Sequence, residues 1–291
     1  MLTASGACWR YDRRMLVAEP LVRSWKARLS LGFTCLDRKT ILSERSHDGP
    51  LVVQKPLYPE GGAVCHAIVV HPPGGIAGGD ELTLGVRTGE NAAALLTTPG
   101  ATKWYRSAGP RASQNISFGV SGLLEWLPQE TIVFDGARAE TETSVELDGG
   151  AGLIGWDIVC LGRTGSGERF GRGSYRSTIQ VRREKRLLWR ERARIDGGDR
   201  LLQAPVGLNG KPVFGTLFAA FSTIEKRLVD AVREQKPLDG DGAVTLLPGI
   251  LLARYLGDSS EAARRYFIAL WRILRPALCG RNATEPRIWH T

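Results

Sequence analysis

Residues 25–33 read WKARLSLGF, and the alternate residues from Trp25 to Phe33 are apolar. Successive side chains of a strand point to opposite faces, so this spacing predicts a β-strand with one buried face. The same alternation recurs in the runs ELTLGV (81–86), NISFGV (115–120) and IGWDIVC (154–160). About a dozen such runs, each bounded by Gly, Pro, Asn or Asp, lie between residues 25 and 221. They predict a mainly β fold, a large antiparallel or helical-type β architecture.

Two segments near the C-terminus have helical rather than strand periodicity. In STIEKRLVDAVREQ (222–235), apolar residues recur every four positions, and Ser222 and Glu225 have the spacing of a capping box. In SSEAARRYFIALWRILRPAL (259–278), an apolar stripe follows two serines that can cap a helix, and Pro276 limits it. The sequence therefore predicts two α-helices near the C-terminus, packed on the sheet.

Domain organisation and location follow from the composition along the chain. Residues 1–24 have mixed charge and no clean period and predict a partly flexible tail, whereas residues 25–291 predict a single domain. No apolar run approaches the ~20 residues of a membrane span. The first apolar stretch is interrupted by charged residues, unlike a secretory signal. The five cysteines are scattered without a C-x-x-C motif, which favours reduced thiols and a cytoplasmic protein.

Positive charge is concentrated in two stretches of the chain. The net charge is +9, and residues 172–194 hold nine Lys/Arg against two Asp/Glu. Residues 1–45 hold nine Lys/Arg against four Asp/Glu. A basic stretch of this kind indicates either a solvated face or a docking surface for an acidic partner. Nucleic acid is a third alternative, but no RNP, KH, zinc-finger or helix-turn-helix motif accompanies the charge.

The glycine-rich stretch HPPGGIAGGD (71–80) lacks the features of a phosphate-binding loop. It has no Gly-Lys-Ser/Thr, and the segment that follows it has strand periodicity, so no helix N-terminus faces a phosphate. The chain also has no G-x-S-x-G motif. Cys65 and His66 are neighbours that a strand directs to opposite faces, so they do not form a nucleophile–base pair. These patterns favour neither nucleotide binding nor nucleophilic catalysis.

Histidine and cysteine do not form a metal-ligand cluster in the sequence. The run VCHAIVVH places Cys65 and His71 on one face of a strand, about 20 Å apart at ~3.3 Å per residue, with His66 on the other face. A tight zinc-type site within one chain is therefore not expected. His66 and His71 are interpreted as strand-surface histidines, with a weak metal contact as the alternative.

Four carboxylates stand in apolar or glycine-rich surroundings. Asp80 ends the glycine-rich stretch, and Glu125 lies beside a tryptophan in LLEWLP. Asp157 lies in IGWDIVC on the face opposite Trp156, and Glu168 lies in GSGERF. An acid that is buried without a partner costs free energy. Each of the four is therefore expected either to form a structural salt bridge to an arginine or to line a polar path through the β fold.

Five stretches of the sequence are informative when taken in order: HPPGGIAGGDELTLGV (71–86), ALLTTPGATKWYRS (94–107), LEWLPQETIVFDGARA (124–139), GWDIVCLGR (155–163) and PRIWHT (286–291). Together they resemble one known family, the urease accessory protein UreD family, called UreH in some organisms. The resemblance extends over roughly residues 25–291 and does not cover the residues before Trp25.

The resemblance implies a non-catalytic, β-rich scaffold that takes part in urease maturation. It implies that the chain binds the urease apoprotein and the accessory protein UreF, and through UreF the GTPase UreG that carries nickel. It implies no tightly bound cofactor, but Ni²⁺ in transit through a water-filled tunnel lined partly by acidic residues. By this resemblance Asp80, Asp157 and Glu168 are candidate tunnel contacts. Spaced carboxylates suit transit, because clustered thiolates or imidazoles would hold nickel tightly.

Overall fold

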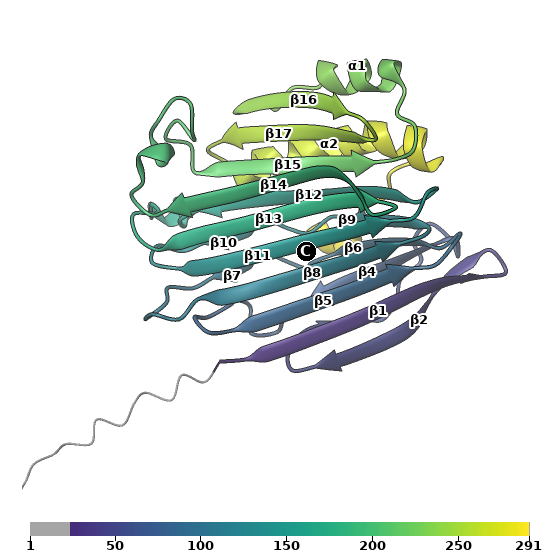
Figure 1. The fold of residues 1–291 in the computed structure, drawn as a ribbon, viewed down its shortest axis with the longest axis horizontal. Coiled ribbons are helices and arrows are strands. Elements are labelled where there is room, and N and C mark those ends of the chain that lie inside the picture. Colours follow the sequence, from purple (N-terminus) through teal and green to yellow (C-terminus); the bar gives the residue numbers. More distant parts are fainter. Residues whose placement is uncertain (1–23, 291) are drawn as a thin grey trace, which may run out of the picture.

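The computed structural model describes residues 24–290 and contains two stacked β-sheets, with helices on the outer face of one of them (Figure 1). The sheet nearer the viewer in Figure 1 is called the front sheet, and the other is called the back sheet. The mainly β prediction is confirmed. Of the predicted N-terminal tail, only Ser24 lies within the described residues. Among residues 24–290, no helix has the length and apolar character that a membrane span requires.

The front sheet has seven strands and the back sheet has ten. In spatial order, the front sheet consists of β14 (Arg186–Asp196), β13 (Ser174–Arg183), β11 (Arg138–Leu147), β8 (Ala112–Val120), β5 (Glu81–Thr88), β1 (Lys26–Leu36) and β2 (Lys39–Asp48). The main path of the back sheet consists of β16 (Asp241–Leu247), β17 (Ile250–Gly257), β15 (Val213–Ala220), β12 (Gly152–Leu161), β9 (Leu123–Trp126), β6 (Ala93–Thr97), β4 (Val64–Val70) and β3 (Val52–Val53). The short strands β7 (Thr102–Trp104) and β10 (Thr131–Val133) continue it beside β12.

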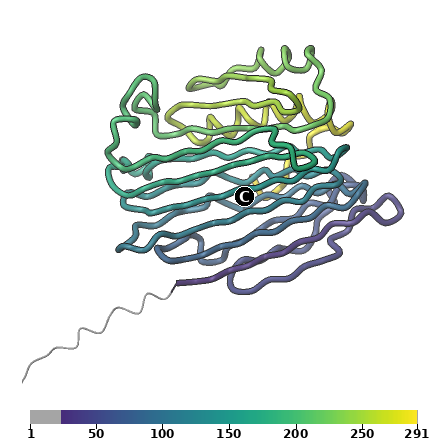
Figure 2. Tube along the Cα trace, viewed as in Figure 1, coloured from purple at the N-terminus to yellow at the C-terminus, as the bar shows by residue number. Residues whose placement is uncertain are grey.

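The chain crosses repeatedly between the two sheets, as the trace in Figure 2 shows. Strands β5, β8, β11 and β13 enter the front sheet, while β4, β6, β9 and β12 enter the back sheet in alternation. Within each of these sets, adjacent strands are parallel, because each return to a sheet is made in the same direction. The helical-type architecture is confirmed. The sheets are mixed rather than uniformly antiparallel, and antiparallel pairs occur toward their edges.

Two apolar layers stabilise the fold, one between the sheets and one between the back sheet and the helices. From the opening run, Leu29 and Phe33 are buried in the first layer, whereas Trp25 precedes β1 and is 48% exposed. The back sheet is covered on both faces, and this explains why β12 is almost continuously buried and apolar. The front sheet has one solvent-facing side, and its strands keep the alternating pattern that the sequence displays.

The two predicted helices are present, with differences at their ends. Helix α1 (Lys226–Glu234) has Glu225 as its N-cap without a side-chain bond, so the capping box predicted from Ser222 is wrong. Helix α2 (Ser260–Cys279) starts as predicted, since the Ser259 hydroxyl accepts a hydrogen bond from the Ala262 amide. It continues past Pro276 to Cys279 and is followed by the left-handed Gly280, so the proline lies in the last turn instead of ending the helix.

Candidate functional site

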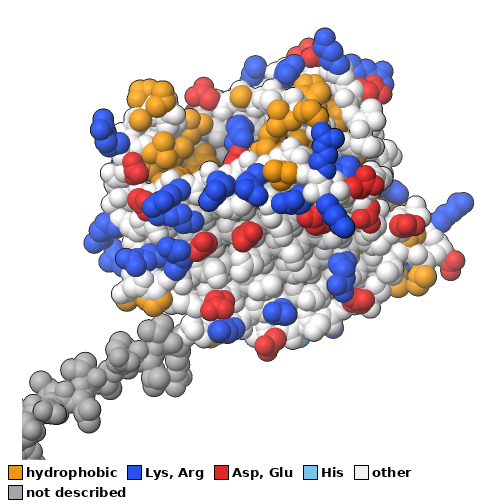
Figure 3. All heavy atoms as spheres, in the orientation of Figure 1, with side chains coloured by type: hydrophobic (Ala, Val, Ile, Leu, Met, Phe, Trp, Pro, Cys, Tyr) orange, Lys and Arg blue, Asp and Glu red, His pale blue; other side chains and the backbone are white. Residues whose placement is uncertain are grey.

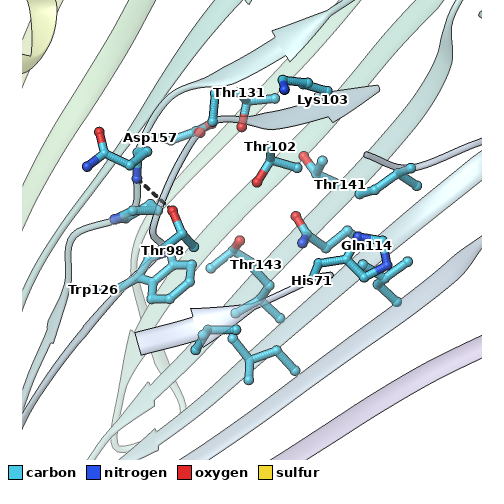
Figure 4. A pocket seen from close by; sticks show the side chains of 18 of the residues that line it. His71, Thr98, Thr102, Lys103, Gln114, Trp126, Thr131, Thr141, Thr143 and Asp157 are labelled. Atoms are coloured by element: carbon cyan, nitrogen blue, oxygen red, sulfur yellow. Dashed lines mark hydrogen bonds between the residues drawn. The ribbon is translucent and has the colours of Figure 1, made fainter. Parts of the chain in front are cut away.

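A cavity of about 280 Å³, lined by both polar and apolar side chains, lies between the two sheets (Figure 4). This volume is well above the roughly 15 Å³ that one buried water requires, so the cavity has room for several waters. Its titratable side chains are His71, Lys103, Asp157 and Tyr175. Hydroxyl and amide side chains supply further polar groups: Thr98, Thr102, Gln114, Gln129, Thr131, Thr141, Thr143 and Ser177.

Much of the cavity wall is formed where three neighbouring strands of the back sheet end. Strands β4, β6 and β9 are adjacent and parallel, so their carboxyl ends lie at one level. The segments that follow these ends, residues 71–76, 98–103 and 128–131, contribute to the lining. The glycine-rich stretch therefore turns the chain beside the cavity. Gly75 lets the chain approach Tyr105 closely there, because a Cβ at this position would lie 2.3 Å from the Tyr105 ring unless that ring moved.

Asp157 projects from β12 into the space between the sheets. Its neighbours Trp156 and Ile158 pack in the layer under the helices, so strand alternation directs Asp157 the other way, as the sequence predicted. None of the described residues donates a hydrogen bond to its carboxylate. Burial raises the pKa of Asp157 to about 7, and the nearby Glu191 carboxylate adds to this rise. A cation that enters the cavity would therefore be attracted to the Asp157 carboxylate in its charged form.

His71 is a second functional candidate on the cavity wall, and its place differs from the prediction. It lies just beyond the end of β4, at the cavity, rather than on a strand surface. Its buried Nε2 atom has no hydrogen-bond partner among the described residues. Burial lowers the pKa of His71, and the charge of Asp80 opposes this only partly. A neutral imidazole with an unpaired nitrogen is a competent metal ligand.

Asp80 has a structural role that the geometry makes clear. Its side chain is buried, and its two carboxylate oxygens accept hydrogen bonds from the amides of Trp25 and Ala77, each at 2.8 Å. These bonds fix the glycine-rich turn and the entry into β1. Asp80 is not among the residues that line the cavity. The partners are backbone amides and not the arginine that the sequence suggested as the structural alternative.

Glu168 also lies away from the cavity. It belongs to a separate hollow of about 370 Å³, together with Thr164, Lys211 and Asp258. Its carboxylate binds the Arg163 guanidinium, with Oε2 at 2.7 Å from Nη2, and accepts the amides of Arg163 and Asp135. The Arg163 guanidinium lowers the pKa of Glu168. The structure therefore does not bring Asp80, Asp157 and Glu168 together at one place.

A buried ion network joins the back sheet to helix α2. Arg275 donates to both oxygens of Glu125 at 3.0 Å and to Glu60, and the Trp271 indole donates to Glu125 at 2.6 Å. The His66 ring approaches Glu60 at 2.6 Å. Burial opposes ionisation of Glu60, but hydrogen bonds from His66 and Arg275 outweigh it and lower its pKa to about 2. Glu125 thus has the arginine partner expected as its structural alternative, and His66 is buried rather than exposed at a strand surface.

The C-terminal segment closes the outer side of the same wall. The Trp289 indole donates to the Thr97 hydroxyl at 2.8 Å, and Thr97 in turn donates to the carbonyl of Leu127. Trp289 also packs against Trp156 and Trp271. Trp289, from the motif PRIWHT, therefore supports the strand ends that frame the cavity. Thr97 is the last residue of β6, and the lining segment 98–103 begins directly after it.

The fold and the cavity define a class of protein: a two-sheet β scaffold with an apolar core and, between its sheets, a cavity that is partly polar. Within residues 24–290, no group of three His, Cys, Asp or Glu side chains is placed to hold one metal ion. Residues 26–290 match the family described as UreD urease accessory protein, and the chain belongs to this family.

Curated relatives resemble the chain over nearly its whole length. The "Urease accessory protein UreD" of Azoarcus sp. (strain BH72) is 53% identical over 281 residues, covering 96% of this chain and 98% of the relative. The protein of the same name from Dechloromonas aromatica (strain RCB) is 54% identical over 274 residues, covering 92% and 95%. The relative from Nitrosococcus oceani is 49% identical over 286 residues, covering 98% and 96%.

Proposed function

We propose that this chain is a cytoplasmic urease maturation factor that acts as a scaffold and as a conduit for Ni²⁺, without catalysing a reaction itself. Membership of the UreD family supports the part in urease maturation. The observation that carries the conduit is the cavity between the sheets, which holds an Asp157 carboxylate and a His71 nitrogen that have no partner among the described residues. Nickel is the cargo of this protein and is bound only in passing.

The cavity chemistry suits brief contacts with a divalent cation. One carboxylate and one imidazole give fewer ligands than a structural metal site, which usually has four. Hydroxyls and waters complete the shell weakly, and the Lys103 ammonium in the same wall opposes long residence of a cation. Asp157 is the principal contact in this proposal, and His71 is the second. Nickel contacts at Asp80 and Glu168 stay predictions from the resemblance. The carboxylates of both residues already accept hydrogen bonds from protein donors, so neither is a principal contact in this proposal.

The same proposal includes the partners. The chain would bind the urease apoprotein and UreF, and would meet the GTPase UreG through UreF. Co-purification of the full chain with the apoprotein and with UreF tests this part. Retention of neither partner, together with full nickel loading of urease when the gene is deleted, would reject the scaffold role.

The conduit is tested by Asp157→Asn, which keeps the size of the side chain and removes the charge. Urease that matures with this variant should contain several-fold less nickel, while partner binding stays at the level of the unmodified chain. Asp48→Asn is the matched control, since Asp48 is exposed on β2 and away from the cavity. If nickel content is the same with both variants, Asp157 is not on the route.

A further inference from the structure

The basic stretch forms a strip of arginines along β14, at the edge of the front sheet. Arg190, Arg192 and Arg194 alternate along the strand and are exposed on its solvent-facing side. None of the three guanidinium groups forms an ion pair or hydrogen bond with a residue in the described range 24–290. Figure 3 shows Lys/Arg side chains as a blue band across this part of the molecule. These three residues are called the arginine strip.

The acidic residues of the neighbouring strands leave the charge of the strip largely uncompensated. Across the sheet from Arg192, the first neighbour is Thr178 and the second is Glu142. The other acids on β11 already bind other arginines: Glu140 binds Arg111, and Glu146 binds Arg182. Arg176, which is paired in register with Arg194, binds Asp196 at 2.7 Å.

One end of the strip opens into a shallow basin with the same sign of charge. The basin has a volume of about 430 Å³, and five arginines line it with Asp196: Arg106, Arg111, Arg138, Arg172 and Arg176. The Asp135 carboxylate accepts two N–H groups of the Arg172 guanidinium and so fixes its orientation. Asp135, Glu140 and Asp196 pair with arginines of this basin, so acids are fewer than arginines here too.

Apolar side chains flank the arginine strip at both ends of β14. Leu187, at its start, is 43% exposed. Leu201 and Val206, in the segment that follows β14, are 38% and 98% exposed. Figure 3 shows apolar side chains beside the blue band. Arginine combined with exposed apolar groups is typical of a protein interface.

The occupant that fits this surface best is an acidic protein segment. Single-stranded nucleic acid is usually bound on exposed aromatic side chains, but Tyr175 of β13 and Trp189 of β14 are both buried. We propose that the arginine strip docks an extended acidic segment of a partner protein, with carboxylates on alternate residues facing Arg190, Arg192 and Arg194.

The spacing of the strip makes the proposal specific. Alternate residues of a strand lie ~6.6 Å apart, so an extended segment with an acid at every second position matches the three guanidinium groups in register. The proposal is independent of the nickel route, since the strip lies on the outer face and does not line the cavity.

The test uses two fluorescent twelve-residue peptides with the full-length protein. One peptide alternates Glu and Ser, and the other has the same composition with its glutamates in one block. The alternating peptide should bind more tightly, and R190E/R192E/R194E should weaken its binding by about tenfold or more. The control variant R28E/R45E/K55E changes net charge equally at exposed positions elsewhere and should change binding less than about twofold.

Each other outcome overturns the proposal. Equal binding of the two peptides, or equal loss in the control variant, would reduce the effect to net charge. Tighter binding of a twelve-nucleotide single-stranded DNA would assign the strip to nucleic acid. Self-association of the triple variant with unchanged peptide binding would show that the arginines only protect a sheet edge. If the triple reversal does not fold, R190Q/R192Q/R194Q gives the same comparison with a milder change.

Discussion

Two carboxylates project from neighbouring strands of the back sheet, Glu125 from β9 and Asp157 from β12, and their surroundings differ. Glu125 faces helix α2, where Arg275 and Trp271 donate to its oxygens. Asp157 faces the front sheet and the cavity between the sheets, without a donor among the described residues. A buried acid with its partners holds elements together, whereas a buried acid without one has unused binding capacity. The comparison assigns Glu125 to the structural framework of this protein and Asp157 to its candidate functional site.

The largest expected loss of stability comes from breaking the ion network around Glu125. Arg275→Ala leaves Glu60 and Glu125 buried without their cation and should lower the free energy of unfolding by about 3–5 kcal/mol. Urea unfolding followed by circular dichroism measures this. Arg265→Ala on the exposed face of the same helix removes only an i,i+4 pair with Glu261 and should cost less than about 0.5 kcal/mol. Similar losses in both variants would contradict the assignment of the network as framework.

The dependence of stability on pH should have opposite signs in the two regions. The pKa of Glu60 is lowered to about 2, so its contribution is present above its unfolded value near ~4.3 and is lost as the pH falls toward 2. The pKa of Asp157 is raised to about 7, so the folded state loses stability as the pH rises from ~4 to 7. Each contribution is on the order of 3–4 kcal/mol, because one pKa unit corresponds to about 1.4 kcal/mol.

Two variants isolate these contributions in unfolding measurements across that pH range. Asp157→Asn should flatten the curve between pH ~4 and 7, and Glu60→Gln should flatten it below ~4.3. A curve that keeps its slope between pH ~4 and 7 in Asp157→Asn would place the titrating group elsewhere.

The two histidines extend the comparison to a smaller effect. His66→Ala removes one of the two partners of Glu60 and should destabilise the fold by about 1–2 kcal/mol. His71→Ala removes no described hydrogen-bond partner, so its stability cost should be the smaller, while nickel delivery to urease should fall. Thermal unfolding and the nickel content of matured urease measure the two effects. A reversed pattern would mean that His71 belongs to the framework.

The smallest effect is expected at Glu168. Its pair with Arg163 is partly exposed, so Glu168→Gln should cost no more than about 1 kcal/mol. If Glu168 is only structural, nickel loading of urease stays unchanged in this variant. A clear decrease in nickel, with stability preserved, would restore Glu168 as a contact on the route.

Much of the fold was predictable because strand alternation records burial directly. Leu29 and Phe33 were expected on one buried face and lie there. The direction of strand pairing was not predictable, because parallel and antiparallel strands share the same period of two. The site was predictable in part. Alternation gave the face on which Asp157 projects, but His71 lies beyond the end of a strand, where the period no longer applies.

The sequence by itself determined the strand-rich architecture, the two helices and the family. It also singled out Asp157 and Glu125 as acids in apolar surroundings. Only the tertiary structure decided which of them is compensated, since Arg275 stands 150 positions from Glu125 and 215 from Glu60 along the chain. Helix α2 brings that cation to one face of the back sheet, while the other face retains a cavity. A period in the sequence reports which face a residue occupies, but the partner on that face depends on how distant elements pack.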